Sequence, residues 1–97
     1  MSENNRIVLT AKEAIKVLPD GDEIHTFTGG GAMIFGADWS RKEAIKTLKL
    51  AKRIELAGKN ARSMGHGLAV FEQNDDLYFL ETNEDKLKEL ENAKKYR

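Results

Sequence analysis

The chain contains no cysteine, a single proline and no apolar run approaching about 18 residues. The absence of cysteine excludes disulfide bridges and thiolate metal sites. Without a long apolar run there is no candidate membrane span, and the polar start MSENNR has none of the features of a signal peptide. We therefore expect a cytoplasmic protein. The length of 97 residues predicts one domain over residues 1–97, with residues 1–6 disordered.

The chain also has no net charge, although its charges are unevenly distributed. Residues 41–62 hold eight Lys and Arg against two Glu, and residues 72–91 hold eight Asp and Glu against two Lys. The basic segment suits either an anionic ligand or a solvated helix face. Zero net charge and the acidic segment argue against nucleic-acid binding, which needs several phosphate contacts.

The glycine motifs that bind phosphate are absent. Ile34 stands where G-x-G-x-x-G, counted from Gly29, needs its third glycine. Ala37 and Asp38 stand where the Walker A pattern needs Lys and Ser or Thr. Two histidines are too few for a His-based metal site, and no ligand spacing stands out. The sequence therefore predicts neither a bound metal nor a cofactor.

Hydrophobic periodicity and capping residues predict three helices. Thr10 with Glu13 and Ser40 with Glu43 match the capping box, and apolar positions spaced for one helical face follow each of them. These signals predict helices over 11–18 and 41–51. Thr82 is expected to cap a last helix over 83–96.

Short alternating or apolar segments predict the strands. The segments are 23–28, 32–35, 68–72 and 77–81, with a loop over 36–39. Residues 53–56 fit either a fifth strand or an extension of the helix before them, and 57–67 fit either a loop or a short helix over 60–64. The order of elements predicts an α+β fold: a mainly antiparallel sheet of four to five strands with about three helices packed on one face.

The segment from Glu23 to Trp39 has the composition of a binding site. Gly29, Gly30 and Gly31 permit φ > 0 and close approach of backbone N–H groups to an anion, or form a simple turn. Thr28 adds a hydroxyl beside them. Trp39 is suited to stack on a planar ring, or to pack as a hydrophobic staple on the following helix. His25 alternates with Phe27, which favours a core histidine over a ligand.

Arg62 and His66 form a second candidate cluster. Arginine is suited to bidentate phosphate contacts, and the glycines on either side of His66 are expected to leave its imidazole accessible. The alternative is a plain connecting segment. If both segments converge, they predict a site for a small anionic, ring-bearing ligand such as a nucleotide, with the residues Thr28, Gly29, Gly30, Gly31, Trp39, Arg62 and His66.

The segments HTF…GGG…GADW (residues 25–39) and ARSMGHGL (residues 61–68) resemble small proteins encoded by bacteriophages and prophages. The resemblance implies a non-enzymatic, homo-oligomeric counter-defence protein that sequesters a nucleotide signal in the host cytoplasm, with subunit interfaces at its sites. It implies as the alternative an inhibitor that binds a host defence protein through its charged surfaces. A third hypothesis is an enzyme that uses His66 as a general base.

Overall fold

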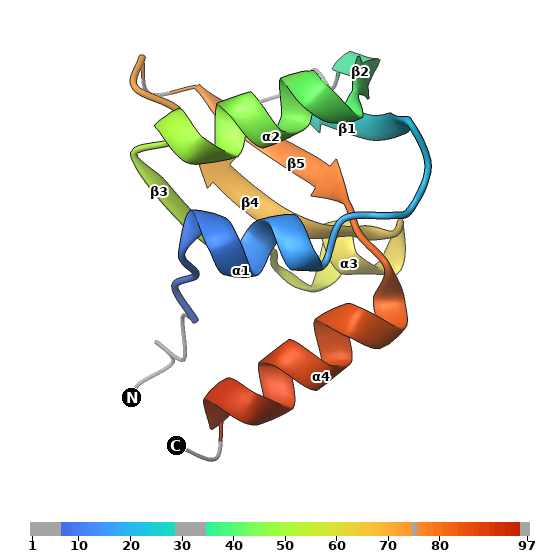
Figure 1. Ribbon diagram of the computed structural model, residues 1–97, viewed down its shortest axis with the longest axis vertical. Coiled ribbons are helices and arrows are strands. Elements are labelled where there is room, and N and C mark those ends of the chain that lie inside the picture. The colour runs from blue at the N-terminus through green and yellow to red at the C-terminus, as the bar shows by residue number, and fades with distance from the viewer. Residues whose placement is uncertain (1–6, 29–34, 75, 96–97) are drawn as a thin grey trace.

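The computed structural model of the chain describes residues 7–28, 35–74 and 76–95. Their strands form a single antiparallel sheet in the order β2-β1-β5-β4-β3 (Figure 1). This result confirms the predicted α+β class and a sheet of five strands. The elements are α1 Ala11–Lys16, β1 Glu23–Thr28, β2 Phe35–Ser40, α2 Arg41–Leu50, β3 Arg53–Leu56, α3 Lys59–Ser63, β4 His66–Phe71, β5 Leu77–Glu81 and α4 Glu84–Lys95.

Both predicted capping boxes are present. The hydroxyls of Thr10 and Ser40 each accept the backbone N–H three residues on, and the carboxylates of Glu13 and Glu43 accept the N–H of the capping residue. These contacts satisfy N–H groups that have no partner within the helix. The last helix is capped by Asn83 instead of the predicted Thr82, because the Asn83 side chain accepts the Lys86 N–H at 3.1 Å.

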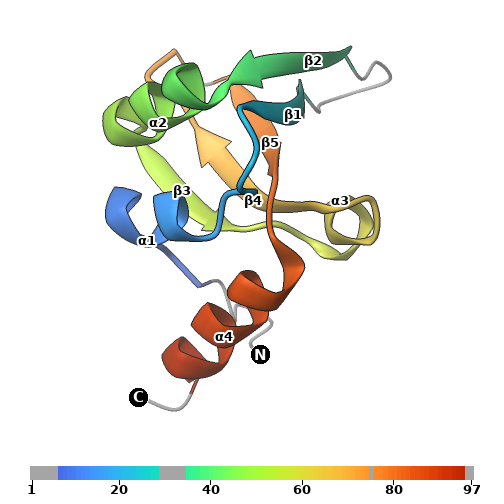
Figure 2. The same cartoon turned by 45° about the vertical axis from the view of Figure 1, so that its right-hand side comes forward.

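The two faces of the sheet are covered unequally (Figure 2). Helices α1 and α2 lie on one face, called here the first face, and α4 adds Leu87 to the same core. Buried side chains of this core include Leu18, Ile24, Leu68 and Leu80. The five-residue helix α3 lies against the opposite, second face, where Phe27, Ala57, Ala61 and Ala69 form a smaller cluster.

One predicted loop is wrong. Residues 36–39 belong to β2, which pairs with β1 along its whole length. Trp39 lies opposite Ile24 and packs on the main core, so the alternation of the strand outweighs the turn tendency of Gly36 and Asp38. The predictions for residues 1–6, for Gly29 to Gly31 and for most of the strand 32–35 lie outside the described residues.

The two segments with open alternatives have defined structures. Residues 53–56 form β3, which pairs with β4, and residues 59–63 form α3. No helix within the described ranges is both long enough and apolar enough to cross a membrane.

Candidate functional site

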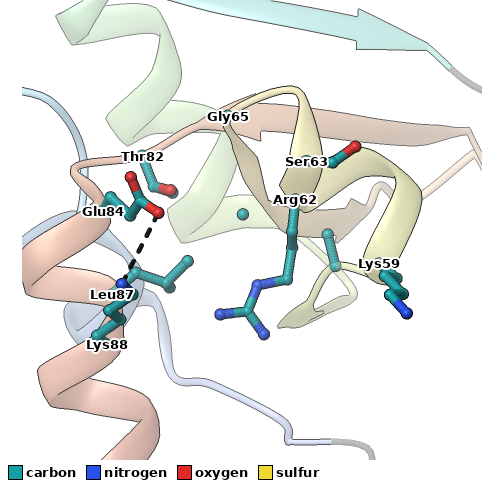
Figure 3. Close-up of a pocket in the computed structure, with 10 residues that line it drawn as sticks. Lys59, Arg62, Ser63, Gly65, Thr82, Glu84, Leu87 and Lys88 are labelled. Carbon is teal, nitrogen blue, oxygen red and sulfur yellow. Dashed lines mark ion pairs between the residues drawn. The ribbon is translucent and has the colours of Figure 1, made fainter.

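A cleft of about 730 Å³ lies between α3, the start of β4 and the first turns of α4 (Figure 3). Lys59, Arg62 and Ser63 line it from α3. Lys88 and Glu84 line it from α4. Ala57, Gly65, Gly67, Thr82 and Leu87 complete the lining. We refer to it as the α3–α4 cleft.

Arg62 points into the space between the two helices (Figure 3). Its guanidinium donates to both oxygens of Glu91 on α4, at 3.2 Å and 2.7 Å. These hydrogen bonds raise the pKa of Arg62 and lower the pKa of Glu91. The pair uses one N–H of each terminal nitrogen, so other guanidinium donors are left to bind an anion. Glu91 therefore holds Arg62 in position without using all of its donors.

Two lysines add positive charge to the cleft. Lys59 lies on α3, and Lys88 lies one helical turn after Glu84 on α4, with 3.9 Å between the ammonium and the carboxylate. Because Glu91 offsets Arg62 and Glu84 offsets one lysine, the cleft keeps a surplus of one positive charge. The hydroxyls of Thr82 and Ser63 are neutral donors beside these cations.

A β-bulge at the start of β4 shapes the cleft. His66 lies opposite Glu81 and Leu68 opposite Leu80, so Gly67 is the extra residue. A Cβ atom at Gly67 would overlap the end of the Leu87 side chain and approach the Thr82 hydroxyl to 2.5 Å. Glycine at this position therefore allows β4 to approach α4 without moving the Leu87 and Thr82 side chains.

The bulge also brings the two histidines together on the second face. The Nδ1 atom of His25 lies 3.0 Å from Oδ1 of Asp38, and the ring centroids of His25 and His66 are 5.0 Å apart. The backbone N–H of His25 donates to the Glu81 carboxylate at 3.1 Å. These four side chains form a polar row across β2, β1, β5 and β4. The prediction of a core histidine is wrong for His25, whose side chain is 52% exposed.

His66 is the buried member of this row. Only 4% of the residue is exposed. The Met64 backbone lies close to the ring, but neither ring nitrogen has a well-aligned hydrogen-bond partner. Burial, and next the neighbouring His25, lower the pKa of His66. Its ring packs edge-on against Phe27, with centroids 4.5 Å apart. The expectation that flanking glycines leave this imidazole accessible is therefore wrong.

The sheet separates Trp39 from this region. Trp39 packs on the first face, 5.1 Å from the ring of Tyr78 and against the core that contains Ala44, which supports the staple interpretation. Thr28 ends β1 at the side of the undescribed glycines. Of the predicted site residues that the structure describes, Arg62 alone lines the α3–α4 cleft.

No family model, curated protein or solved structure matches this chain. The resemblance to phage-encoded proteins therefore stays a prediction. Within the described ranges, no group of three or more His, Asp or Glu side chains is arranged to hold a metal ion.

The sequence contains a signal for cleft residues that the sequence analysis did not predict. The helix alternative for 60–64 would have placed Lys59 on the same helical face as Arg62 and Ser63, since they are three and four residues apart. Asp38 was missed as the partner of His25 because it was assigned to a loop.

Proposed function

We propose that this chain binds and sequesters a small phosphorylated ligand of the nucleotide class in the α3–α4 cleft. The observation that carries the proposal is the surplus of positive charge in a cleft of about 730 Å³. Small-molecule sites commonly have volumes of roughly 300–1,000 Å³ and a few well-placed polar groups. The proposal keeps the predicted ligand class and changes the location of the site.

The lining residues divide the recognition of such a ligand between them. Arg62, held by Glu91, presents its remaining N–H donors in a planar array that matches phosphate oxygens. Lys59 and Lys88 act as point charges at the two sides of the cleft. Leu87 offers an apolar contact to a sugar or a base. Trp39, on the first face, takes no part.

Binding without turnover is the form of the proposal that the site favours. A general base must lie within hydrogen-bond reach of the proton that it abstracts. The nitrogens of His66, the base considered from the sequence, are buried, and His66 does not line the cleft.

Isothermal titration calorimetry against cyclic dinucleotides, ADP-ribose derivatives and mononucleotides tests the proposal. We expect one of these classes to bind at micromolar concentration or better. Lys59→Ala and Lys88→Ala should each weaken the affinity by about 10-fold to 100-fold, the effect of losing a charged hydrogen bond. Lys42→Ala and Lys49→Ala, on the exposed side of α2, are the matched controls and should bind normally.

Two results would count against the proposal. The first is the absence of binding heat from every ligand class with protein that is folded by circular dichroism. The second is an equal loss of affinity in the α2 controls, which would indicate non-specific attraction. Chromatography of the ligand after incubation separates the two forms of the hypothesis: sequestration returns it unchanged, and a new product would indicate an enzyme.

A further inference from the structure

The two edges of the sheet differ in whether another described segment of the chain pairs with them. Residues 7–9 run along β3: the Leu9 N–H donates to the Ile54 carbonyl at 2.8 Å, and the Leu56 N–H donates to the Ile7 carbonyl at 3.0 Å. At the other edge, β2 pairs with β1 alone among the described residues. Figures 1 and 2 both show β2 at the outer boundary of the sheet. Residues 7–9 therefore cover one edge, and none of the segments that the structure describes covers the other, which is called here the open edge.

The backbone groups of β2 alternate in direction, as they do in any antiparallel strand. The N–H of Arg41, just after β2, donates to the Asp22 carbonyl at 2.7 Å. The Ala37 carbonyl accepts the Thr26 hydroxyl at 3.2 Å. Odd-numbered residues of β2 therefore direct their backbone groups toward β1.

The even-numbered residues direct theirs away from the sheet. The N–H of Ser40 fits this pattern, because it donates to the Glu43 carboxylate and not to β1. Gly36 and Asp38 consequently present two N–H groups and two carbonyl groups along the outer edge. Such a row of groups is a template for pairing with another strand.

Strand β2 also has few of the side chains that usually protect an edge. Its sequence, FGADWS, contains no Lys, Arg or Pro. Its single charge, on Asp38, lies 3.0 Å from His25. Phe35 is 61% exposed, which makes it the most exposed large apolar residue among those described. An edge with this composition favours pairing instead of opposing it.

The strand is self-complementary about Ala37. In an antiparallel pair of two β2 strands centred there, Ala37 faces Ala37 of the second copy, Gly36 faces Asp38, and Phe35 faces Trp39. Gly36 and Asp38 then form the hydrogen-bonded pairs that their outward groups require. The register also places two aromatic side chains opposite each other, which stabilises a sheet. The adjacent register toward Ser40 would instead oppose two Asp38 carboxylates, which is unfavourable.

We propose that two copies of this chain associate through β2, antiparallel about a two-fold axis, to form one continuous ten-stranded sheet. The occupant of the open edge is thus a second copy. In this dimer, Phe35 of each copy packs on the first face of the other copy's sheet. This inference rests on β2 alone and does not depend on ligand binding in the α3–α4 cleft.

Light scattering coupled to size exclusion, over a range of protein concentrations, tests the proposal. The unmodified chain should show twice the mass of one copy, and dilution should reduce that mass. Ala37→Lys and Ala37→Glu should each be monomeric, because like charges would face each other across the axis. An equimolar mixture of the two variants should recover the doubled mass. Ala93→Lys, the same change on the exposed side of α4, should remain dimeric.

Hydrogen exchange provides the second measurement. The amides of Gly36 and Asp38 should exchange more slowly in the dimer than in Ala37→Lys, while the other strands exchange alike in both proteins. The proposal is overturned by a folded chain that is monomeric at every concentration, or by a dimer that both Ala37 variants preserve. An unprotected Gly36 amide within a dimer, or a heterologous peptide that occupies β2 in place of the second copy, would overturn it as well.

Discussion

Substitution of Gly67 by alanine tests the closest packing contact of the cleft. The added Cβ would overlap the end of the Leu87 side chain and lie 2.5 Å from the Thr82 hydroxyl oxygen. Thr82 is partly exposed and can rotate away, but Leu87 is only 3% exposed and belongs to the main core. The added Cβ must therefore shift the Leu87 side chain within the core or increase the separation of β4 and α4.

Overpacking of this kind costs about 1–3 kcal/mol of the free energy of unfolding. A domain of this length loses roughly 4–8 °C in melting temperature for each kcal/mol. We therefore expect Gly67→Ala to lower the melting temperature by about 5–20 °C. Urea unfolding followed by circular dichroism should show a lower midpoint with an unchanged slope.

The matched control is Gly21→Ala. No atom lies within 4 Å of the position that its Cβ would occupy, so its stability should change by no more than about 1 kcal/mol and in the stabilising direction. A double-mutant cycle with Leu87 tests whether contact with this side chain causes the loss of stability in Gly67→Ala. Truncation by Leu87→Ala should cost less in the Gly67→Ala background than in the unmodified chain. Equal melting temperatures for the two glycine variants, or equal costs of truncation in both backgrounds, would refute this explanation.

Two further predictions concern ionisable groups. The pKa of His66 is lowered below its unfolded value of 6.5, so its contribution to stability is fully present above that pH and is lost as the pH falls below it. His66→Phe should therefore flatten this part of the profile of stability against pH in urea titrations. An unchanged profile would contradict a lowered pKa of His66. A double-mutant cycle on Arg62→Ala and Glu91→Ala should give a coupling of about 0.5–1 kcal/mol, modest because the side chains are 31% and 20% exposed. Since the pKa of Glu91 is lowered, this coupling should be present at neutral pH and disappear as acid protonates the carboxylate; a coupling that persists in acid would refute the ion pair.

Local signals in the sequence predicted the elements well where side chains act on their own backbone. The boxes at Thr10 and Ser40 each join residues three positions apart, so their geometry follows from the sequence alone. At the last helix the predicted cap was Thr82, and the structure has Asn83 as the cap instead. The choice depends on the path of the chain after β5, where the Thr82 N–H donates to the Gly65 carbonyl.

The candidate site depended on distant pairings that the sequence does not reveal. The expected convergence of Trp39 with Arg62 failed because β2 is a strand that turns Trp39 toward the first face. The meeting of His25 with His66 requires the bulge at Gly67, which changes the face that His66 occupies. The chain contains no turn signal or periodicity that specifies this extra residue. Arg62 was predicted to bind phosphate, and its pairing with Glu91 on α4 was not predicted, because the two residues are 29 positions apart in the sequence.

The segment at residues 7–9 covers β3, and this bears on the size of an assembly formed through the proposed pairing of β2. Pairing through β2 uses the same surface on both copies, so the two-fold contact closes on itself. In such a pair the outer strand of each copy would be β3, whose backbone groups at Ile54 and Leu56 already bond to Leu9 and Ile7. Under the proposed pairing, a third copy could not add to β3 through these groups, because Ile7 and Leu9 already bond to them. If both edges of the sheet were open, strand addition could continue beyond two copies.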